Sequence, residues 1–395
     1  MSTILKKHFP MLKDRQTIIR EIKSNSDLLN TYDGWSRDEQ EKFLDYCTGE
    51  RGLKITYDPY FKEIFNYNYN PERLNNLLSC IIGQKVEILE VLPNEGARIA
   101  SEKTLLITDM LVRLEDQSLV NIEIQKIGYL FPGERASCYS ADLLLREYKR
   151  VRDERKRHFK YGDIKPVYTI VIFEDSPSNL KGAKDFYIHK SNTVFDTGVK
   201  INLLQKFIFI SLDNFKDILH NRVEAIKQNS IALATHTNDK SNNDSIKLFE
   251  NKLEEWLTFL SIDEPEYIAM LINHNPYFKA IYSDIYEMCL NTERLMQMYS
   301  KELAELDHNT VIYMIDEIKA EADRLKEEAN RAKEEADRAK EEANIAKEEA
   351  NRAKEETNKS KEEINKAKEE TDRAKEEAIR LKAENEKLKK QLEEI

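Results

Sequence analysis

Two acidic residues and a glutamine have the types and spacing of a site that binds a divalent cation. Asp109 and Glu123 lie in two segments rich in aliphatic and β-branched residues, and Gln125 follows two positions after the second acid. Carboxylates that face each other repel, and hard cations such as Mg²⁺ prefer carboxylate oxygens as ligands. A divalent cation is therefore the most economical compensation, and Asp109 and Glu123 are the candidate metal ligands.

The two acids face each other only if their segments pair. A short polar run separates the apolar segments 104–114 and 119–126, which predicts a β-hairpin. With a loop of three residues, Asp109 lies opposite Glu123, and Gln125 shares their face because side chains alternate along a strand. An exposed edge hairpin would also carry acids. The metal interpretation is favoured because aspartate is disfavoured within strands and its partner is a second acid instead of a lysine.

Composition excludes several classes of protein. The 395 residues are 40% hydrophobic, enough for one or two folded domains, and the net charge is −11. The four cysteines are far apart in sequence, which favours neither a zinc site nor a disulfide framework and fits a reducing cytosol. No segment approaches the roughly 20 apolar residues of a membrane span. We expect a cytoplasmic protein without membrane contact.

The elements around the hairpin follow a definite order: helix, three strands, helix, strand. Apolar spacing predicts helices over 58–82, with a break near residues 66–70, and over 135–160. Alternation predicts a strand over 85–92, and the apolar run 167–173 is typical of a strand buried on both faces. Strand-like segments at 185–189 and 206–212 favour a larger sheet.

Changes in composition along the chain predict five segments. They are a helical lead-in (1–50), an α/β core (51–235), a polar linker (236–245), a helical region (246–317) and a heptad-repeat tail (318–395).

The tail has the repeat of a coiled coil, with semi-apolar residues at spacings of 4 and 3 over residues 318–395. We expect a homodimer through this segment. Of its 23 seam positions 12 are alanine, so little apolar surface would be buried on pairing. A single charged helix standing alone in water is the alternative.

A basic cluster with interleaved aromatic residues lies at the end of the second predicted helix. On an otherwise acidic chain it fits contacts to the phosphate backbone of DNA, although a solvated helix face is the alternative. The candidate DNA contacts in this cluster are Arg146, Lys149, Arg150, Arg152 and Lys156.

The order of elements and several short motifs resemble one branch of the PD-(D/E)XK nucleases, the Rpn family of recombination-promoting nucleases and related transposases. The likeness covers about residues 55–300. The matching pieces are Tyr57-Asp-Pro-Tyr-Phe-Lys-Glu-Ile-Phe65, Leu74–Ile82, Ile107-Thr-Asp-Met110, Val120-Asn-Ile-Glu-Ile-Gln125, Arg135 with Tyr139, and the strand Tyr168–Phe173.

The resemblance implies a restriction-endonuclease-like α/β core and a Mg²⁺-dependent DNA endonuclease linked to recombination or mobile elements. Asp109 and Glu123 match the metal-binding acids, and Gln125 matches the position usually held by the catalytic lysine. Gln125 can orient a water through its amide but carries no charge, so Arg135 is the candidate that supplies charge and contacts DNA. A catalytically weak or inactive DNA-binding scaffold with a coiled-coil tail is the alternative. A transposase that joins DNA strands would need the same metal site.

Overall fold

The structure is a computed structural model that describes residues 3–92, 110–127, 133–235 and 247–393. The chain forms two compact units, Met1–Thr310 and Val311–Ile395. Asp109 and the predicted polar linker 236–245 lie outside the described residues.

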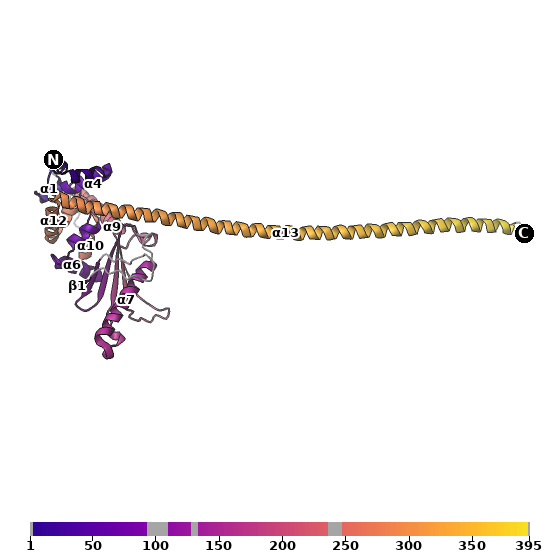
Figure 1. Cartoon of the computed structure of the whole chain (residues 1–395), viewed down its shortest axis with the longest axis horizontal. Coiled ribbons are helices and arrows are strands. Elements are labelled where there is room, and N and C mark those ends of the chain that lie inside the picture. The colour runs from indigo at the N-terminus through magenta and orange to yellow at the C-terminus, as the bar shows by residue number, and fades with distance from the viewer. Residues whose placement is uncertain (1–2, 93–109, 128–132, 236–246, 394–395) are drawn as a thin grey trace. The chain divides into compact units, whose positions relative to one another are not determined.

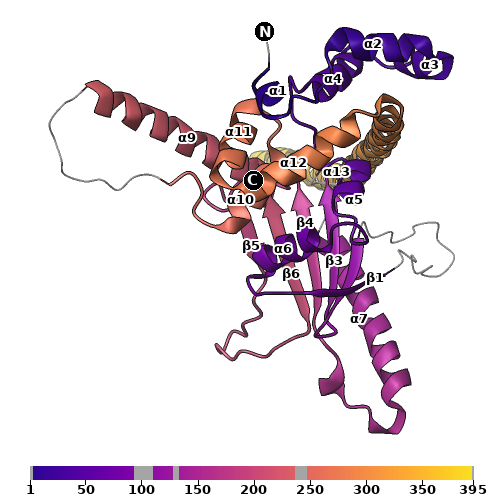
Figure 2. The ribbon, with the colours of Figure 1, turned by 90° about the vertical axis from the view of Figure 1, so that its left-hand side faces the viewer.

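The first unit is built on a mixed six-stranded sheet in the order β1-β2-β3-β4-β6-β5 (Figure 2). β3 and β4 are parallel, as are β4 and β6, and the other neighbouring pairs are antiparallel. The strands are β1 (Ile88–Leu92), β2 (Met110–Leu114), β3 (Leu119–Gln125), β4 (Val167–Phe173), β5 (Ile188–Lys190) and β6 (Gln205–Ser211).

Helices precede, connect and follow these strands. They are α1 (Ile4–His8), α2 (Arg15–Ser24), α3 (Ser26–Asp33), α4 (Arg37–Thr48), α5 (Asp58–Ile64), α6 (Pro71–Ile82), α7 (Gly133–Arg155), α8 (Ser178–Lys181), α9 (Leu212–Thr235), α10 (Lys252–Ser261), α11 (Pro265–His274), α12 (Pro276–Cys289) and α13 (Thr292–Glu393). The observed order α6, β1, β2, β3, α7, β4 agrees with the predicted order, and the mixed α/β class is confirmed.

The predicted hairpin has the expected register. Met110 lies opposite Ile122 and Arg113 opposite Leu119, so residues 115–117 form the loop. Gln117 has a φ of +71°, the left-handed conformation that three-residue hairpin loops use. The prediction that Asp109 faces Glu123 extends this register by one residue, beyond the described part of β2.

The two faces of the sheet pack against different helices. Val120 and Ile122 of β3 join the main core, which includes apolar residues of α5, α6, α9, α10 and α12. The alternate residues of β3 face α7, whose Leu143 packs with Leu119 and whose Tyr139 packs with Phe173 of β4. Glu123 and Gln125 alternate with Ile122 along β3, so they belong to the α7 face.

One predicted helix boundary agrees with the structure and one differs from it. The expected break within 58–82 is present, because α5 ends at Ile64 and Pro71 opens α6. The helix predicted over 135–160 ends at Arg155 instead, and Lys156 takes a φ of +49°, outside the region in which an α-helix continues.

The second unit consists of one helical segment. α13 runs without interruption to Glu393, and its residues 321–390 are all exposed (Figure 1). At 1.5 Å per residue, the 102 residues of α13 measure about 150 Å. Among the described helices, none is long and apolar enough to cross a membrane.

Candidate active site

Glu123 is a carboxylate inside the sheet, with 1% of its surface exposed. It lies on β3 beside Val171 of β4, and Asn121 donates a hydrogen bond from Nδ2 to Glu123 Oε1 at 3.0 Å. Burying a carboxylate is costly unless polar groups or a cation compensate it. A charged residue kept at such a position is a candidate for chemistry rather than for solubility.

Further polar atoms lie next to Glu123 without a hydrogen-bond partner in the described part of the chain. They are Oδ1 of Asn121 and Oγ1 of Thr169, two residues that neighbour each other across β3 and β4. Both side chains are fully buried. Oxygen atoms of carboxylate, amide and hydroxyl groups are the ligands that hard divalent cations take. The chemistry of these oxygen atoms therefore fits a hard divalent cation such as Mg²⁺.

The donor set is incomplete without Asp109. Within the described ranges, no group of three or more His, Cys, Asp or Glu residues could hold a metal ion. Asp109 lies outside these ranges, so the facing carboxylates stay a prediction.

Gln125 is the last residue of β3 and lies two positions beyond Glu123 on the same face. It is half-buried, and its backbone carbonyl accepts a hydrogen bond of 2.9 Å from the N–H of Glu174. The expected order of acid and amide along one strand face is therefore present, at the carboxyl end of a central parallel strand.

Arg135 lies in the first turns of α7, at this same end of the sheet. Its Nη2 donates to the Tyr139 hydroxyl at 3.0 Å, and its guanidinium lies 5.5 Å from the Tyr139 ring centroid. Tyr139 is buried against Val171 and Phe173, the β4 neighbours of Glu123 and Gln125. The structure thus brings Arg135 to the end of the sheet where the predicted catalytic residues lie.

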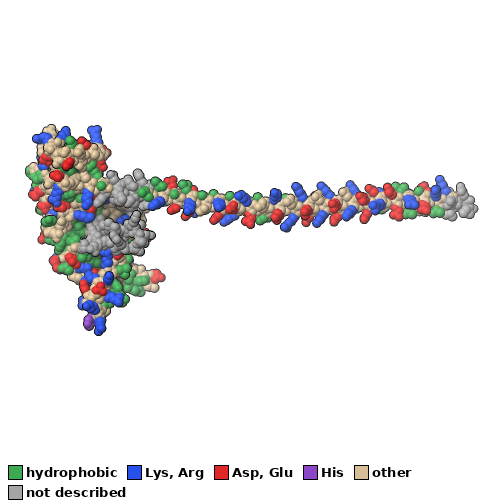
Figure 3. Space-filling view, viewed as in Figure 1, with side chains coloured by type: hydrophobic (Ala, Val, Ile, Leu, Met, Phe, Trp, Pro, Cys, Tyr) green, Lys and Arg blue, Asp and Glu red, His purple; other side chains and the backbone are tan. Residues whose placement is uncertain are grey.

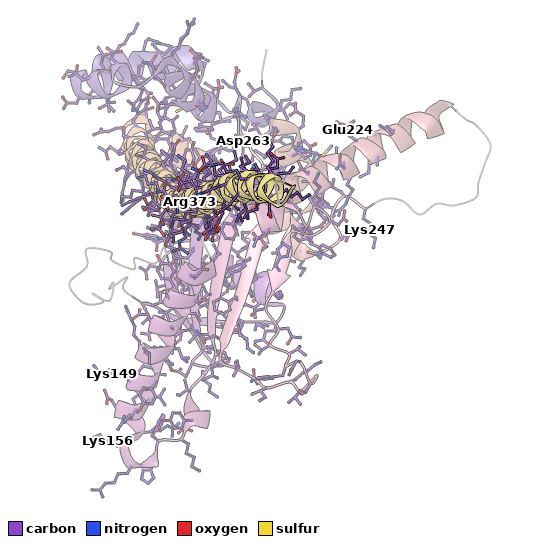
Figure 4. The ribbon with its side chains drawn as sticks, turned by 90° about the vertical axis from the view of Figure 1, so that its right-hand side faces the viewer. Lys149, Lys156, Glu224, Lys247, Asp263 and Arg373 are labelled. Atoms are coloured by element: carbon purple, nitrogen blue, oxygen red, sulfur yellow. The ribbon has the colours of Figure 1, made fainter. Side chains whose placement is uncertain are left out.

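The other predicted DNA contacts do not lie near Glu123. α7 packs through Tyr139 near the carboxyl end of β4 and through Leu143 at its amino end, so residues after Leu143 extend past the amino end. Figure 4 shows Lys149 and Lys156 toward the far end of the helix. From Tyr139 to Lys156 the path along α7 is about 25 Å at 1.5 Å per residue.

Three of these basic residues have acidic or hydroxyl partners within the helix. Arg146 pairs with Asp142 at 2.8 Å, Arg150 pairs with Glu154 at 2.6 Å, and Arg152 donates to the Tyr148 hydroxyl at 2.7 Å. Lys149 and Lys156 are exposed. The carboxylates of Asp142 and Glu154 offset the charges of Arg146 and Arg150, so the net positive charge of this half of α7 is smaller than the number of lysines and arginines suggests.

Two arginines, Arg113 and Arg150, bind the buried carboxylate of Glu147 on α7. Arg113 of β2 pairs with Glu147 at 2.9 Å, and Arg150 donates to the same carboxylate at 3.0 Å. Burial opposes ionisation of Glu147, but the hydrogen bonds from Arg150 and Arg113 outweigh it and lower the pKa of Glu147. This cluster fixes α7 on the sheet.

The opposite face holds an ionic network that the sequence does not reveal. Lys126 follows Gln125 and, as alternation predicts, lies on the other side of the sheet, where it pairs with Glu302 of α13. Glu302 is fully buried and also accepts a hydrogen bond of 3.1 Å from the backbone N–H of Asp58. The Lys126 ammonium lies 5.7 Å from the ring centroid of Tyr57.

Lys54 extends this network to β4. Its ammonium lies 2.6 Å from a Glu174 carboxylate oxygen and 5.2 Å from the Tyr57 ring centroid. Burial lowers the pKa of Lys54, but the Glu174 charge outweighs that effect and raises it. The one available sequence signal was Glu174 itself, an acid directly after a buried strand. Lys126 and Glu302 are 176 residues apart and share no local pattern.

Asp58, the acid at the start of α5, has a local structural role. It is the first residue of the helix, and its carboxylate accepts a hydrogen bond of 2.8 Å from Lys62. The preceding Tyr57 holds the cap position.

Comparison with known proteins gives one match. A family model described as "PD-(D/E)XK nuclease family transposase" matches residues 55–314. No curated protein and no solved structure matches the chain. The matched range contains the described strands of the sheet, α7, Lys126 and Glu302, and it begins directly after Lys54.

Proposed function

Because the chain belongs to the PD-(D/E)XK nuclease family transposases, we propose that it is a Mg²⁺-dependent endonuclease that hydrolyses phosphodiester bonds of DNA. The observation that carries this proposal is the buried Glu123 carboxylate, placed two residues before Gln125 at the carboxyl end of a central strand. The family also supports a role in recombination or in the movement of mobile elements.

Glu123 and Asp109 would hold the metal ion. When bound, Mg²⁺ polarises the scissile phosphate and lowers the pKa of a water molecule. Asn121 supports this role because its amide fixes one Glu123 oxygen. A carboxylate held in one orientation loses little entropy when it binds a ligand.

Gln125 and Arg135 would act on the phosphate and the attacking water. The Gln125 amide can accept a hydrogen bond from water and so orient it, but it adds no charge. Arg135 is exposed at the start of α7 and can supply positive charge to a phosphate oxygen. Tyr139 would position Arg135 through its hydroxyl and ring.

One observation favours the alternative of a weak or inactive DNA-binding scaffold. The position of the usual catalytic lysine is a glutamine, and the adjacent Lys126 pairs with the buried Glu302 on the opposite face. Arg135 and the metal ion would then have to stabilise most of the negative charge that develops in the transition state. A low cleavage rate is the expected consequence.

The tail would assemble two copies of the chain. Leucine and isoleucine side chains at seam positions are each more than half exposed in the single chain: Ile318, Leu325, Ile364, Leu381 and Leu388. Pairing of two tails would cover this row of apolar side chains.

Plasmid cleavage by the full-length protein tests the proposed site. Asp109→Ala and Glu123→Gln should each lower the Mg²⁺-dependent nicking rate roughly 100-fold or more, because each removes a metal ligand. The matched control is Glu115→Gln, an exposed acid in the loop of the same hairpin. It should cut like the wild type.

Metal binding gives a second readout that does not depend on cleavage. Mg²⁺ or Mn²⁺ should raise the melting temperature of the wild type and of Glu115→Gln, but not of Glu123→Gln. Wild-type nicking rates in both site variants would show that the site is assigned wrongly. Normal metal binding by Glu123→Gln would exclude Glu123 as a ligand.

A further inference from the structure

Three aromatic rings form a separate cluster at the far end of α7. Tyr148 and Tyr161 are stacked, with centroids 6.2 Å apart and an angle of 13° between the rings. Phe159 meets both edge-on, at 5.6 Å and 5.3 Å. None of the three belongs to the hydrophobic core clusters of the described chain. These three residues are called the aromatic platform below.

The platform leaves a large aromatic surface in water. Tyr161 is 74% exposed, whereas Tyr148 and Phe159 are half-buried beneath it. Burial of apolar surface is the usual reason for an aromatic cluster, and it does not account for the most exposed member. The exposed ring is available to a partner.

The connection that carries Tyr161 is an ordered segment. Two short 3₁₀ helices, Lys156–His158 and Tyr161–Asp163, follow α7. The Asp163 carboxylate accepts a hydrogen bond of 2.9 Å from the Lys160 N–H and closes the second of them. Tyr161 is therefore held in place before any partner binds, which lowers the entropy cost of binding.

The surroundings of the platform are basic. Residues 152–165 include six lysines and arginines against three acids, on a chain whose net charge is −11. Of those acids, Glu154 pairs with Arg150 at 2.6 Å and Asp163 closes the turn. Figure 3 shows blue side chains gathered at the lower tip of the molecule, where Figure 1 shows the end of α7.

Arg152 is a basic residue that contacts a ring of the aromatic platform directly. Its guanidinium lies 5.8 Å from the Tyr148 ring centroid, and its Nη1 donates to the Tyr148 hydroxyl at 2.7 Å. Proteins commonly bind single-stranded nucleic acid by stacking a base on the face of an aromatic ring, while neighbouring cationic side chains bind the phosphates. In a duplex the base faces are already stacked on each other, so only the phosphates would be recognised.

We propose that the aromatic platform binds single-stranded DNA by stacking an unpaired base on Tyr161. This inference rests on the proposed function, which identifies the nucleic acid as DNA. It narrows the substrate of the proposed nuclease to DNA with an unpaired segment. Tyr148 of the platform follows Tyr139 by nine residues of α7, about 14 Å at 1.5 Å per residue, the length of roughly four base pairs at 3.4 Å each. The substrate would span both ends of the sheet, with cleavage at one and base stacking at the other.

Binding without cleavage tests the platform. Fluorescence anisotropy of a labelled 20-nucleotide oligo-dT strand and of a 20-base-pair duplex is measured with full-length protein in EDTA. Tyr161→Ala should weaken binding of the single strand roughly tenfold and change duplex binding less than twofold. Tyr161→Phe keeps the ring and should bind like the wild type.

Tyr69→Ala is the matched control, because Tyr69 is a tyrosine of nearly equal exposure, 76%, outside the platform. Lys156→Gln should weaken both DNA forms and flatten the salt dependence, since a phosphate contact does not distinguish them. The melting temperature of each variant confirms that it folds.

Three results would overturn the proposal. The first is unchanged binding of the single strand by Tyr161→Ala, and the second is an equal loss on both DNA forms. The third is loss of self-association by Tyr161→Ala with unchanged DNA binding, which would make the platform a contact between copies of the chain. Binding is measured in EDTA, in which no metal-dependent cleavage takes place, so failure of the cleavage proposal leaves this test independent.

Discussion

The ion pair between Lys126 and Glu302 gives a quantitative test of the packing behind the candidate site. Replacing Glu302 by leucine leaves the Lys126 ammonium, 13% exposed, without this carboxylate, and removes the acceptor of the Asp58 N–H. Breaking a buried pair on one side costs about 3–5 kcal/mol. We expect Glu302→Leu and Lys126→Met each to lower the free energy of unfolding by about 4 kcal/mol.

The double variant should recover most of this loss. Two apolar side chains in place of the pair remove both charges, and such exchanges are often neutral or stabilising. The unpaired Asp58 N–H still costs about 1–3 kcal/mol. The double variant should therefore be about 2 kcal/mol less stable than the wild type, where simple addition of the single effects gives about 8 kcal/mol.

Urea unfolding of the four proteins, followed by circular dichroism, measures this cycle. Lys62→Met is the control, because the Lys62 side chain is 44% exposed and a pair at the surface contributes about 0–1 kcal/mol. Additive losses in the double variant would refute the pairing. So would a loss below about 1 kcal/mol in either single variant.

Three further predictions concern chemistry, pH and assembly. Gln125→Lys should raise the nicking rate roughly tenfold by adding charge near the phosphate, and an unchanged or lower rate in the plasmid assay would contradict the role given to Gln125. The pKa of Glu147 is lowered by Arg150 and Arg113, so its contribution to stability is present above an unfolded pKa of about 4.3 and is lost as the pH falls through the folded pKa. The wild type should lose more stability between pH 6 and pH 3 than Glu147→Gln, as urea midpoints will show. A chain without residues 318–395 should sediment as a monomer and the full chain as a dimer; equal states would exclude pairing through the tail.

The hairpin and the order of elements could be predicted because their signals are local. Period-2 alternation, the polar loop and the apolar run 167–173 each specify a conformation through neighbouring residues. The same alternation placed Glu123 and Gln125 on one face and Lys126 on the other, as the structure has them. The continuous helix of the tail follows from its heptads in the same way.

The end of α7 was the point at which local pattern failed. Helical spacing continues beyond Arg155, but Lys156 adopts a positive φ and the chain turns into two short 3₁₀ helices. That turn brings Phe159 and Tyr161 back onto Tyr148. The sequence showed aromatic residues among lysines and arginines, without showing that the rings stack.

The sequence by itself determined the strand of Glu123 and Gln125 and the faces of its side chains, because a strand's register needs only its turn and its alternation. Only the tertiary structure decided that Lys126 meets Glu302, 176 residues away, and that the basic half of α7 extends past the amino end of β4, away from Glu123. Such placements depend on how whole helices pack on the sheet. Packing is a sum over many residues distant in the chain, and no short pattern encodes it.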